Sequence, residues 1–162
     1  MEHGPVVSTA TLRGARAVGI ACAAAFVVLV ALRLVFPVAS LFAPYHPAYE
    51  RMIAALLLSF GLGLALALRD PVRNAGVYAV IGLSAGFLLG ANVYALAVDG
   101  ADPVRWIAQV PLLAAIALAL VVTYTRLRRP HPVIVRIVVV AVILLPVALF
   151  VYDAAFRALV IR

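Results

Sequence analysis

Five long, mostly apolar blocks alternate with short polar segments along the 162-residue chain. A block of 18 or more apolar residues is typical of a transmembrane helix, because the hydrocarbon core of a bilayer, about 30 Å thick, is crossed by about 20 helical residues. None of the blocks alternates strictly between apolar and polar residues, which favours helices over the strands of a barrel. The pattern predicts an all-α, polytopic transmembrane helical bundle that forms a single domain over residues 1–162. Its five expected spans are residues 17–36, 49–68, 76–98, 104–125 and 133–152.

The third block carries glycine at every fourth position, at Gly82, Gly86 and Gly90. On a helix this spacing aligns the three glycines as one flat stripe. Inside lipid the hydrophobic effect does not hold helices together, and small residues at this spacing let backbones approach closely enough for dispersion contacts to do so. We therefore expect these glycines to serve helix packing, with the third helix at the centre of the bundle.

The composition excludes a water-soluble domain. Hydrophobic residues make up 67% of the chain and charged residues 12%, and the latter value is about half that of an ordinary soluble domain. The net charge is +7, and all basic residues except the histidines are arginines. Because these arginines lie mostly between the blocks, they are expected to set topology and to contact membrane lipids, so no nucleic-acid partner is expected. The single cysteine, Cys22, allows no internal disulfide.

The arginines also predict the orientation, because short loops richer in arginine stay in the cytoplasm. The expected N-terminal segment, second connection and fourth connection hold Arg13, Arg16, Arg69, Arg73, Arg126, Arg128, Arg129 and Arg136. The other side holds Arg33, Arg51, Arg105, Arg157 and Arg162. This bias of eight against five predicts a multi-pass protein of the cell inner (plasma) membrane, with the N-terminus inside and the C-terminus outside.

The first block follows a short basic segment, as in a secretory signal. Its roughly 20 residues exceed the 7–15 residue apolar region of such a signal, and no clean A-x-A site follows it. We expect it to be a retained span.

One motif within the blocks matches a catalytic pattern. Residues 82–86, GLSAG, match the G-x-S-x-G nucleophile elbow, but that motif works on a strained strand-to-helix turn beside a histidine and an acid. No block contains histidine, so glycine packing explains the motif better, with Ser84 bonded to a backbone carbonyl. The chain has no lysine for a Schiff base and no histidine pair for haem, and its blocks have no central carboxylate for ion coupling. We expect no enzyme activity, cofactor or metal.

Polar residues near the expected outer side form the one candidate site. Arg33 either extends to the head groups or pairs with Glu50. Asn92 and Gln109 are expected at similar depth, roughly 8–9 Å from the outer boundary at 1.5 Å per residue, where they could hydrogen-bond across two helices. The group is either such helix pairing alone or a small pocket for a lipid-like or quinone-like molecule or a partner helix. Its members are Arg33, Glu50, Asn92, Asp99 and Gln109.

Residues 49–111 carry several short motifs of a known group. They are Met52-Ile53, Gly61, Ala67, the Arg69-Asp70-Pro71 turn with Asn74, Ser84, and Gln109-Val110-Pro111. Through them the chain resembles small bacterial integral membrane proteins of unknown function, including BphX-like proteins. The resemblance implies a four-helix membrane core and gives no indication of an activity. Members often have a histidine in the third span, where this chain has Leu88, so no role of that histidine is carried over.

These features favour a non-enzymatic accessory, assembly or interaction subunit, because the chain has strong packing features and no reactive ones. Its expected partners are membrane lipids and another membrane protein or a second copy. The alternative is a small transporter or a lipid- or quinone-binding protein with an outer-leaflet pocket, suggested by the polar group and by Pro111 and Pro146 within spans.

Overall fold

The computed structural model describes residues 7–35, 46–98 and 103–160, except for the side chains of residues 33–35, 105, 106, 108 and 160. Within these residues the chain is all-helical and contains no strand. All five helices are long and apolar enough to cross a membrane, which confirms the expected class. The helices are α1 (Thr9–Val35), α2 (Pro47–Ala67), α3 (Ala75–Val98), α4 (Pro103–Arg128) and α5 (Pro132–Val160).

Two helices extend well past their apolar blocks. α1 begins at Thr9, where the Ser8 hydroxyl oxygen accepts a hydrogen bond from the Thr11 backbone N–H at 3.1 Å, as an N-cap residue does. α5 continues to Val160 instead of ending at residue 152, because the residues after Asp153 include the helix formers Ala, Arg and Leu. Apolar length therefore predicts the membrane-crossing part of a helix and not its ends.

The turn between α2 and α3 is held by local hydrogen bonds around Asp70. One Asp70 carboxylate oxygen accepts the Arg73 backbone N–H at 3.0 Å, and the Asn74 side-chain amide donates to the Asp70 carbonyl at 3.0 Å. Side-chain bonds of this kind stabilise turns because they satisfy backbone groups that the helices leave open. They fix how α3 leaves the turn.

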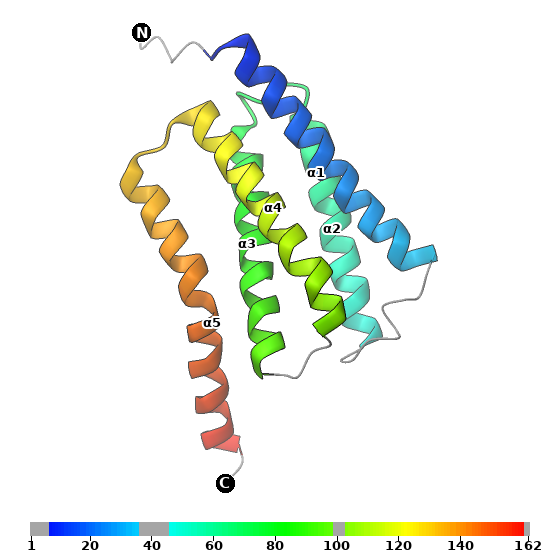
Figure 1. The fold of residues 1–162 in the computed structure, drawn as a ribbon, viewed down its shortest axis with the longest axis vertical. Coiled ribbons are helices and arrows are strands. Elements are labelled where there is room, and N and C mark those ends of the chain that lie inside the picture. The colour runs from blue at the N-terminus through cyan, green and yellow to red at the C-terminus, as the bar shows by residue number, and fades with distance from the viewer. Residues whose placement is uncertain (1–6, 36–45, 99–102, 161–162) are drawn as a thin grey trace.

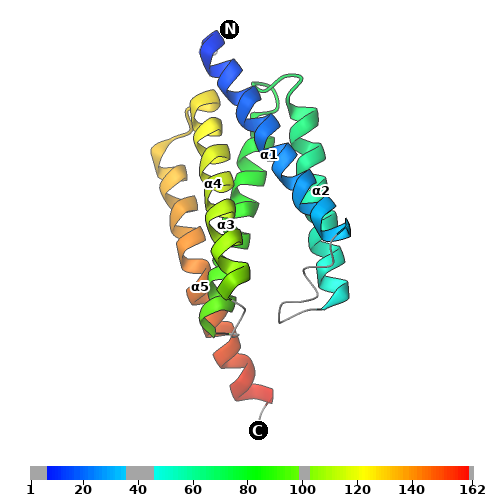
Figure 2. The same ribbon diagram turned by 45° about the vertical axis from the view of Figure 1, so that its right-hand side comes forward.

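Successive helices run in opposite directions, and the two ends of the chain lie at opposite ends of the molecule (Figure 1). α3 packs against α4, α5 and α2, while α1 packs against α2 and α4. α5 lies on the outside of the other four helices, beside α3, in both views (Figures 1 and 2). The architecture is a four-helix bundle with a fifth helix attached to one member.

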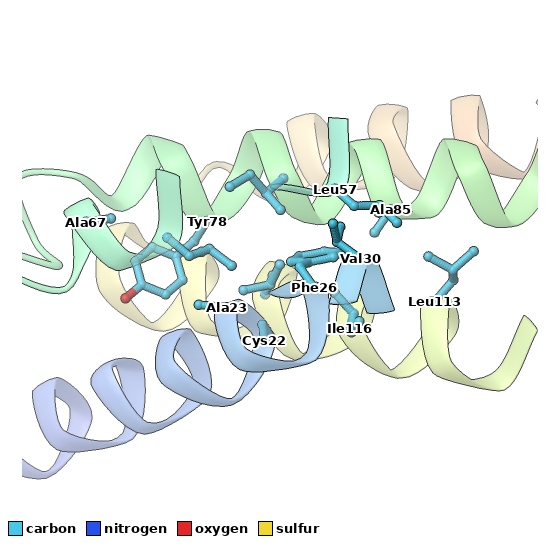
Figure 3. Close-up of a cluster of buried hydrophobic side chains, with 13 residues drawn as sticks. Cys22, Ala23, Phe26, Val30, Leu57, Ala67, Tyr78, Ala85, Leu113 and Ile116 are labelled. Carbon is cyan, nitrogen blue, oxygen red and sulfur yellow. The ribbon is translucent and has the colours of Figure 1, made fainter. Parts of the chain in front are cut away.

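The core lies between α1, α2, α3 and α4 (Figure 3). Phe26 and Tyr78 are fully buried there, and the Phe26 ring packs edge-on against Phe60 with ring centroids 5.7 Å apart. α5 contributes no residue to this cluster, and none of its apolar window is buried. The cluster consists of Cys22, Ala23, Phe26, Val30, Leu57, Leu64, Ala67, Tyr78, Ile81, Ala85, Leu113, Ile116 and Leu120.

The three glycines of the stripe in α3, Gly82, Gly86 and Gly90, are buried and face two different helices. A Cβ atom on Gly82 would lie 3.0 Å from Leu120 Cβ of α4. A Cβ on Gly86 would lie 3.4 Å from Val142 of α5, and one on Gly90 would lie 3.2 Å from Leu145. Residues four apart are not fully aligned on an α-helix, because a turn contains 3.6 residues. The row of glycines therefore shifts around α3, from the side that contacts α4 at Gly82 to the side that contacts α5 at Gly86 and Gly90.

Candidate functional site

The alternating directions of the helices separate the polar residues into two ends. The end that holds the N-terminus of α1, the α2–α3 turn and the α4–α5 turn is called the basic end, because eight arginines lie there (Figure 1). The other end is called the polar end. The arginines of the basic end are Arg13, Arg16, Arg69, Arg73, Arg126, Arg128, Arg129 and Arg136.

At the polar end the structure describes three of the five residues expected to form a site. Glu50 lies in the first turn of α2, Asn92 near the end of α3 and Gln109 in the second turn of α4, and all three are half-buried. Asp99 lies outside the described residues, and so does the side chain of Arg33. The topology brings Glu50, Asn92 and Gln109 to one end of the bundle.

The hydrogen bond considered between Asn92 and Gln109 does not form. Both side chains are described, and no hydrogen bond joins them in this part of the structure. Similar depth on two neighbouring helices is therefore insufficient for pairing, because each side chain must also project toward the other helix.

A different polar pair does form at this end. The hydroxyl of Tyr94 in α3 donates a hydrogen bond to a carboxylate oxygen of Asp153 in α5. Tyr94 is 8% exposed and Asp153 is half-buried. This bond joins the fifth helix to the bundle at the same end as Glu50, Asn92 and Gln109.

The sequence analysis did not single out Asp153, which directly follows the expected fifth span at residues 133–152. The available signal was a carboxylate that follows a long Val- and Ile-rich run without leaving the helix. Carboxylates in or near a span usually find a polar partner, and Tyr94 is such a partner.

Two hydroxyl groups inside the helices, those of Ser59 and Thr123, bond to their own backbone. Ser59 donates to the Ala55 carbonyl at 2.9 Å, and Thr123 donates to the Ala119 carbonyl at 2.7 Å. A hydroxyl in lipid finds the carbonyl four residues earlier when no other partner is near. These groups are structurally satisfied and do not mark a ligand site.

The GLSAG motif lies wholly within α3. Ser84 therefore has helical backbone and not the strained strand-to-helix turn that a nucleophile elbow requires. Among the described residues there is also no group of three or more histidine, cysteine or acidic side chains that could hold a metal.

At the basic end, Tyr78 connects α3 to α1. Its hydroxyl donates a hydrogen bond to the Ala15 carbonyl at 3.2 Å, in a buried position. The ring passes over Gly19, where a Cβ atom would lie 2.7 Å from the hydroxyl oxygen. Glycine at residue 19 therefore makes room for a buried tyrosine that satisfies its polar end on a neighbouring helix.

No protein-family model matches the chain, and no curated protein or solved structure matches it either. The resemblance to BphX-like proteins accordingly stays a prediction. The class is defined by the helices themselves: a helical protein with five segments able to cross a membrane.

Proposed function

We propose that this multi-pass membrane protein is a non-enzymatic accessory or assembly subunit, and that α5 is the helix through which it binds another membrane protein or a second copy of itself. The proposal includes an inner (plasma) membrane location with the N-terminus in the cytoplasm. The observation that carries it is the position of α5, which is 29 residues long and adds no residue to the core.

The way α5 attaches supports this proposal. α5 contacts α3 through Val142, Leu145 and Pro146, at the positions where α3 has Gly86 and Gly90. Close approach at small residues together with a polar pair is how separate helices associate in lipid. α5 is therefore held like a docked helix, by one face and by the bond between Tyr94 and Asp153.

The face of α5 opposite these contacts is apolar and unoccupied in this single chain. Helical periodicity places this face half a turn around the α5 axis from Val142 and Pro146. Its side chains are between 50% and 63% exposed. They recur at alternating spacings of four and three residues, which is the spacing found where two helices pair. The residues of this face are Val133, Ile137, Val140, Leu144, Val147 and Val151.

Purification in a mild detergent from the native membrane tests the proposal. We expect the protein to emerge with a stoichiometric second protein, or as a dimer, when the complex mass is measured. Replacing Val140, Leu144 and Val147 together by alanine should reduce that complex about tenfold, which corresponds to about 1.4 kcal/mol. Replacing the exposed Leu58, Leu62 and Leu66 of α2 by alanine should leave it intact. A monomer without any partner protein would contradict the proposal.

A further inference from the structure

A groove lies at the basic end, along the α2–α3 turn and the first two turns of α3. It is shallow and open to the surroundings, with a volume of about 420 Å³. The groove is lined by Arg73, Asn74, Gly76, Val77, Val80 and Ile81.

The part of the groove along α3 is apolar. Val77, Val80 and Ile81 form it, and Val80 is 62% exposed. Gly76 leaves the space open, because a Cβ atom there would meet nothing within 4 Å. From the start of α3 to Ile81 the helix rises about 9 Å at 1.5 Å per residue. The apolar wall therefore runs from the head-group level into the hydrocarbon region.

The mouth of the groove is cationic. The side chain of Arg73 is exposed, and its backbone N–H is bonded to the Asp70 carboxylate. The Asn74 amide donates one hydrogen bond to the Asp70 carbonyl, which leaves its second N–H and its oxygen available. Asp70 is the one acidic residue at the basic end in the described part of the chain, against eight arginines. The surrounding charge attracts an anion.

We propose that this groove binds one anionic phospholipid of the surrounding bilayer. Its phosphate lies at the Arg73 guanidinium and the Asn74 amide, and the upper part of one acyl chain lies along Val77, Val80 and Ile81. The argument is the match between a cationic mouth at head-group level and an apolar wall that continues into the membrane. A guanidinium binds phosphate through two parallel hydrogen bonds, whereas a zwitterionic lipid brings no net charge to this end. This site is separate from the α5 face and does not depend on the proposed function.

Native mass spectrometry of the full chain tests this assignment. The protein is purified, freed of lipid in detergent and titrated with dioleoyl phosphatidylglycerol or dioleoyl phosphatidylcholine. The first phosphatidylglycerol is expected to bind the wild type at least fivefold more tightly than Arg73→Gln, the loss expected for one basic residue at a membrane surface. Gly76→Leu should weaken binding by at least as much, because its side chain fills the groove.

Matched controls separate the groove from general effects of charge and folding. Arg128→Gln removes an exposed arginine from the same end, and Gly14→Leu adds a side chain at another helical glycine with nothing within 4 Å. Gly14→Leu should bind phosphatidylglycerol as the wild type does. Arg128→Gln should lose less affinity than Arg73→Gln, because it removes a nearby charge and not a direct contact with the phosphate. Phosphatidylglycerol should also raise the unfolding temperature of the wild type more than that of Gly76→Leu, a variant that stays folded because its side chain enters open space.

Three results would overturn the assignment. The first is equal binding of phosphatidylglycerol and phosphatidylcholine by the wild type. The second is unchanged phosphatidylglycerol binding in both Arg73→Gln and Gly76→Leu. The third is a Gly76→Leu variant that binds lipid normally but loses a protein partner, because the groove would then be a protein interface.

Discussion

The hydroxyl of Tyr94 donates its hydrogen bond to the carboxylate of Asp153, so α3 and α5 are joined by a polar contact near the end at which both helices finish. The rest of their contact is apolar and close, at Gly86 and Gly90. In lipid, packing at small residues and interhelical hydrogen bonds are the forces that hold helices together. The attachment of α5 therefore rests on a few residues that can be changed one at a time.

Removing the Tyr94 hydroxyl should loosen α5. We expect Tyr94→Phe to lower the free energy of unfolding by about 0.6 kcal/mol and at most about 1.7 kcal/mol, the range measured for side-chain hydrogen bonds between membrane helices. Denaturation in mixed micelles measures this value. Tyr152→Phe is the control, because the Tyr152 side chain is 65% exposed. This variant should unfold as the wild type does. Equal effects of the two substitutions would show that the bond contributes nothing.

Gly82 should be the least replaceable glycine of the stripe. A Cβ there would lie 3.0 Å from Leu120 Cβ and 3.3 Å from the Val121 backbone nitrogen, so α4 itself must move. We expect Gly82→Val to cost about 1–3 kcal/mol of stability, as overpacking does. Gly14→Ala, at a position with nothing within 4 Å, should stabilise the protein by up to about 1 kcal/mol. Thermal unfolding in detergent measures both, and a stable Gly82→Val variant would contradict the close contact of α3 and α4.

The buried bond from Tyr78 to Ala15 should hold α1 against α3. Tyr78→Phe keeps the ring and removes the donor, so we expect a loss of about 1 kcal/mol. Tyr78→Ala also opens a cavity beside Gly19 and should cost about 3–5 kcal/mol, the usual cost for a buried aromatic residue. Tyr124→Phe serves as the control in the same unfolding measurement. If Tyr78→Ala were as stable as the wild type, the ring would not be a core residue.

The proposed orientation follows from the arginines of the basic end and can be read by labelling intact cells. A cysteine at Ser8 should be shielded from a membrane-impermeant maleimide, whereas one at Leu159, which is 80% exposed, should react. Cys22 is buried and supplies the unreactive background. Labelling of the Ser8 cysteine alone would show the opposite orientation.

The five helices could be predicted from the sequence because an apolar block of membrane length leaves the backbone few alternatives. Their ends could not, since Ser8 and the residues after Asp153 act through capping and helix propensity outside the apolar blocks. The position of α5 was also not predictable. Every block is apolar on all sides, so the sequence does not indicate which helices share the core.

For the polar end, the sequence indicated which residues share an end and not which of them touch. Glu50, Asn92 and Gln109 do lie at one end, as the alternating spans require. Contact depends on where each side chain points around its helix, and this is set by packing. For this reason the bond considered between Asn92 and Gln109 is absent from the described structure, while Tyr94 and Asp153 form a bond that was not anticipated.

Site-specific photo-crosslinking in the native membrane determines whether the outer face of α5 contacts protein. A photoreactive residue is placed at Leu144, 52% exposed on the outer face of α5, or at Leu62, 55% exposed on α2. We predict protein adducts, to a partner or to a second copy, from residue 144 and lipid adducts alone from residue 62. Lipid adducts alone at both residues would contradict the account.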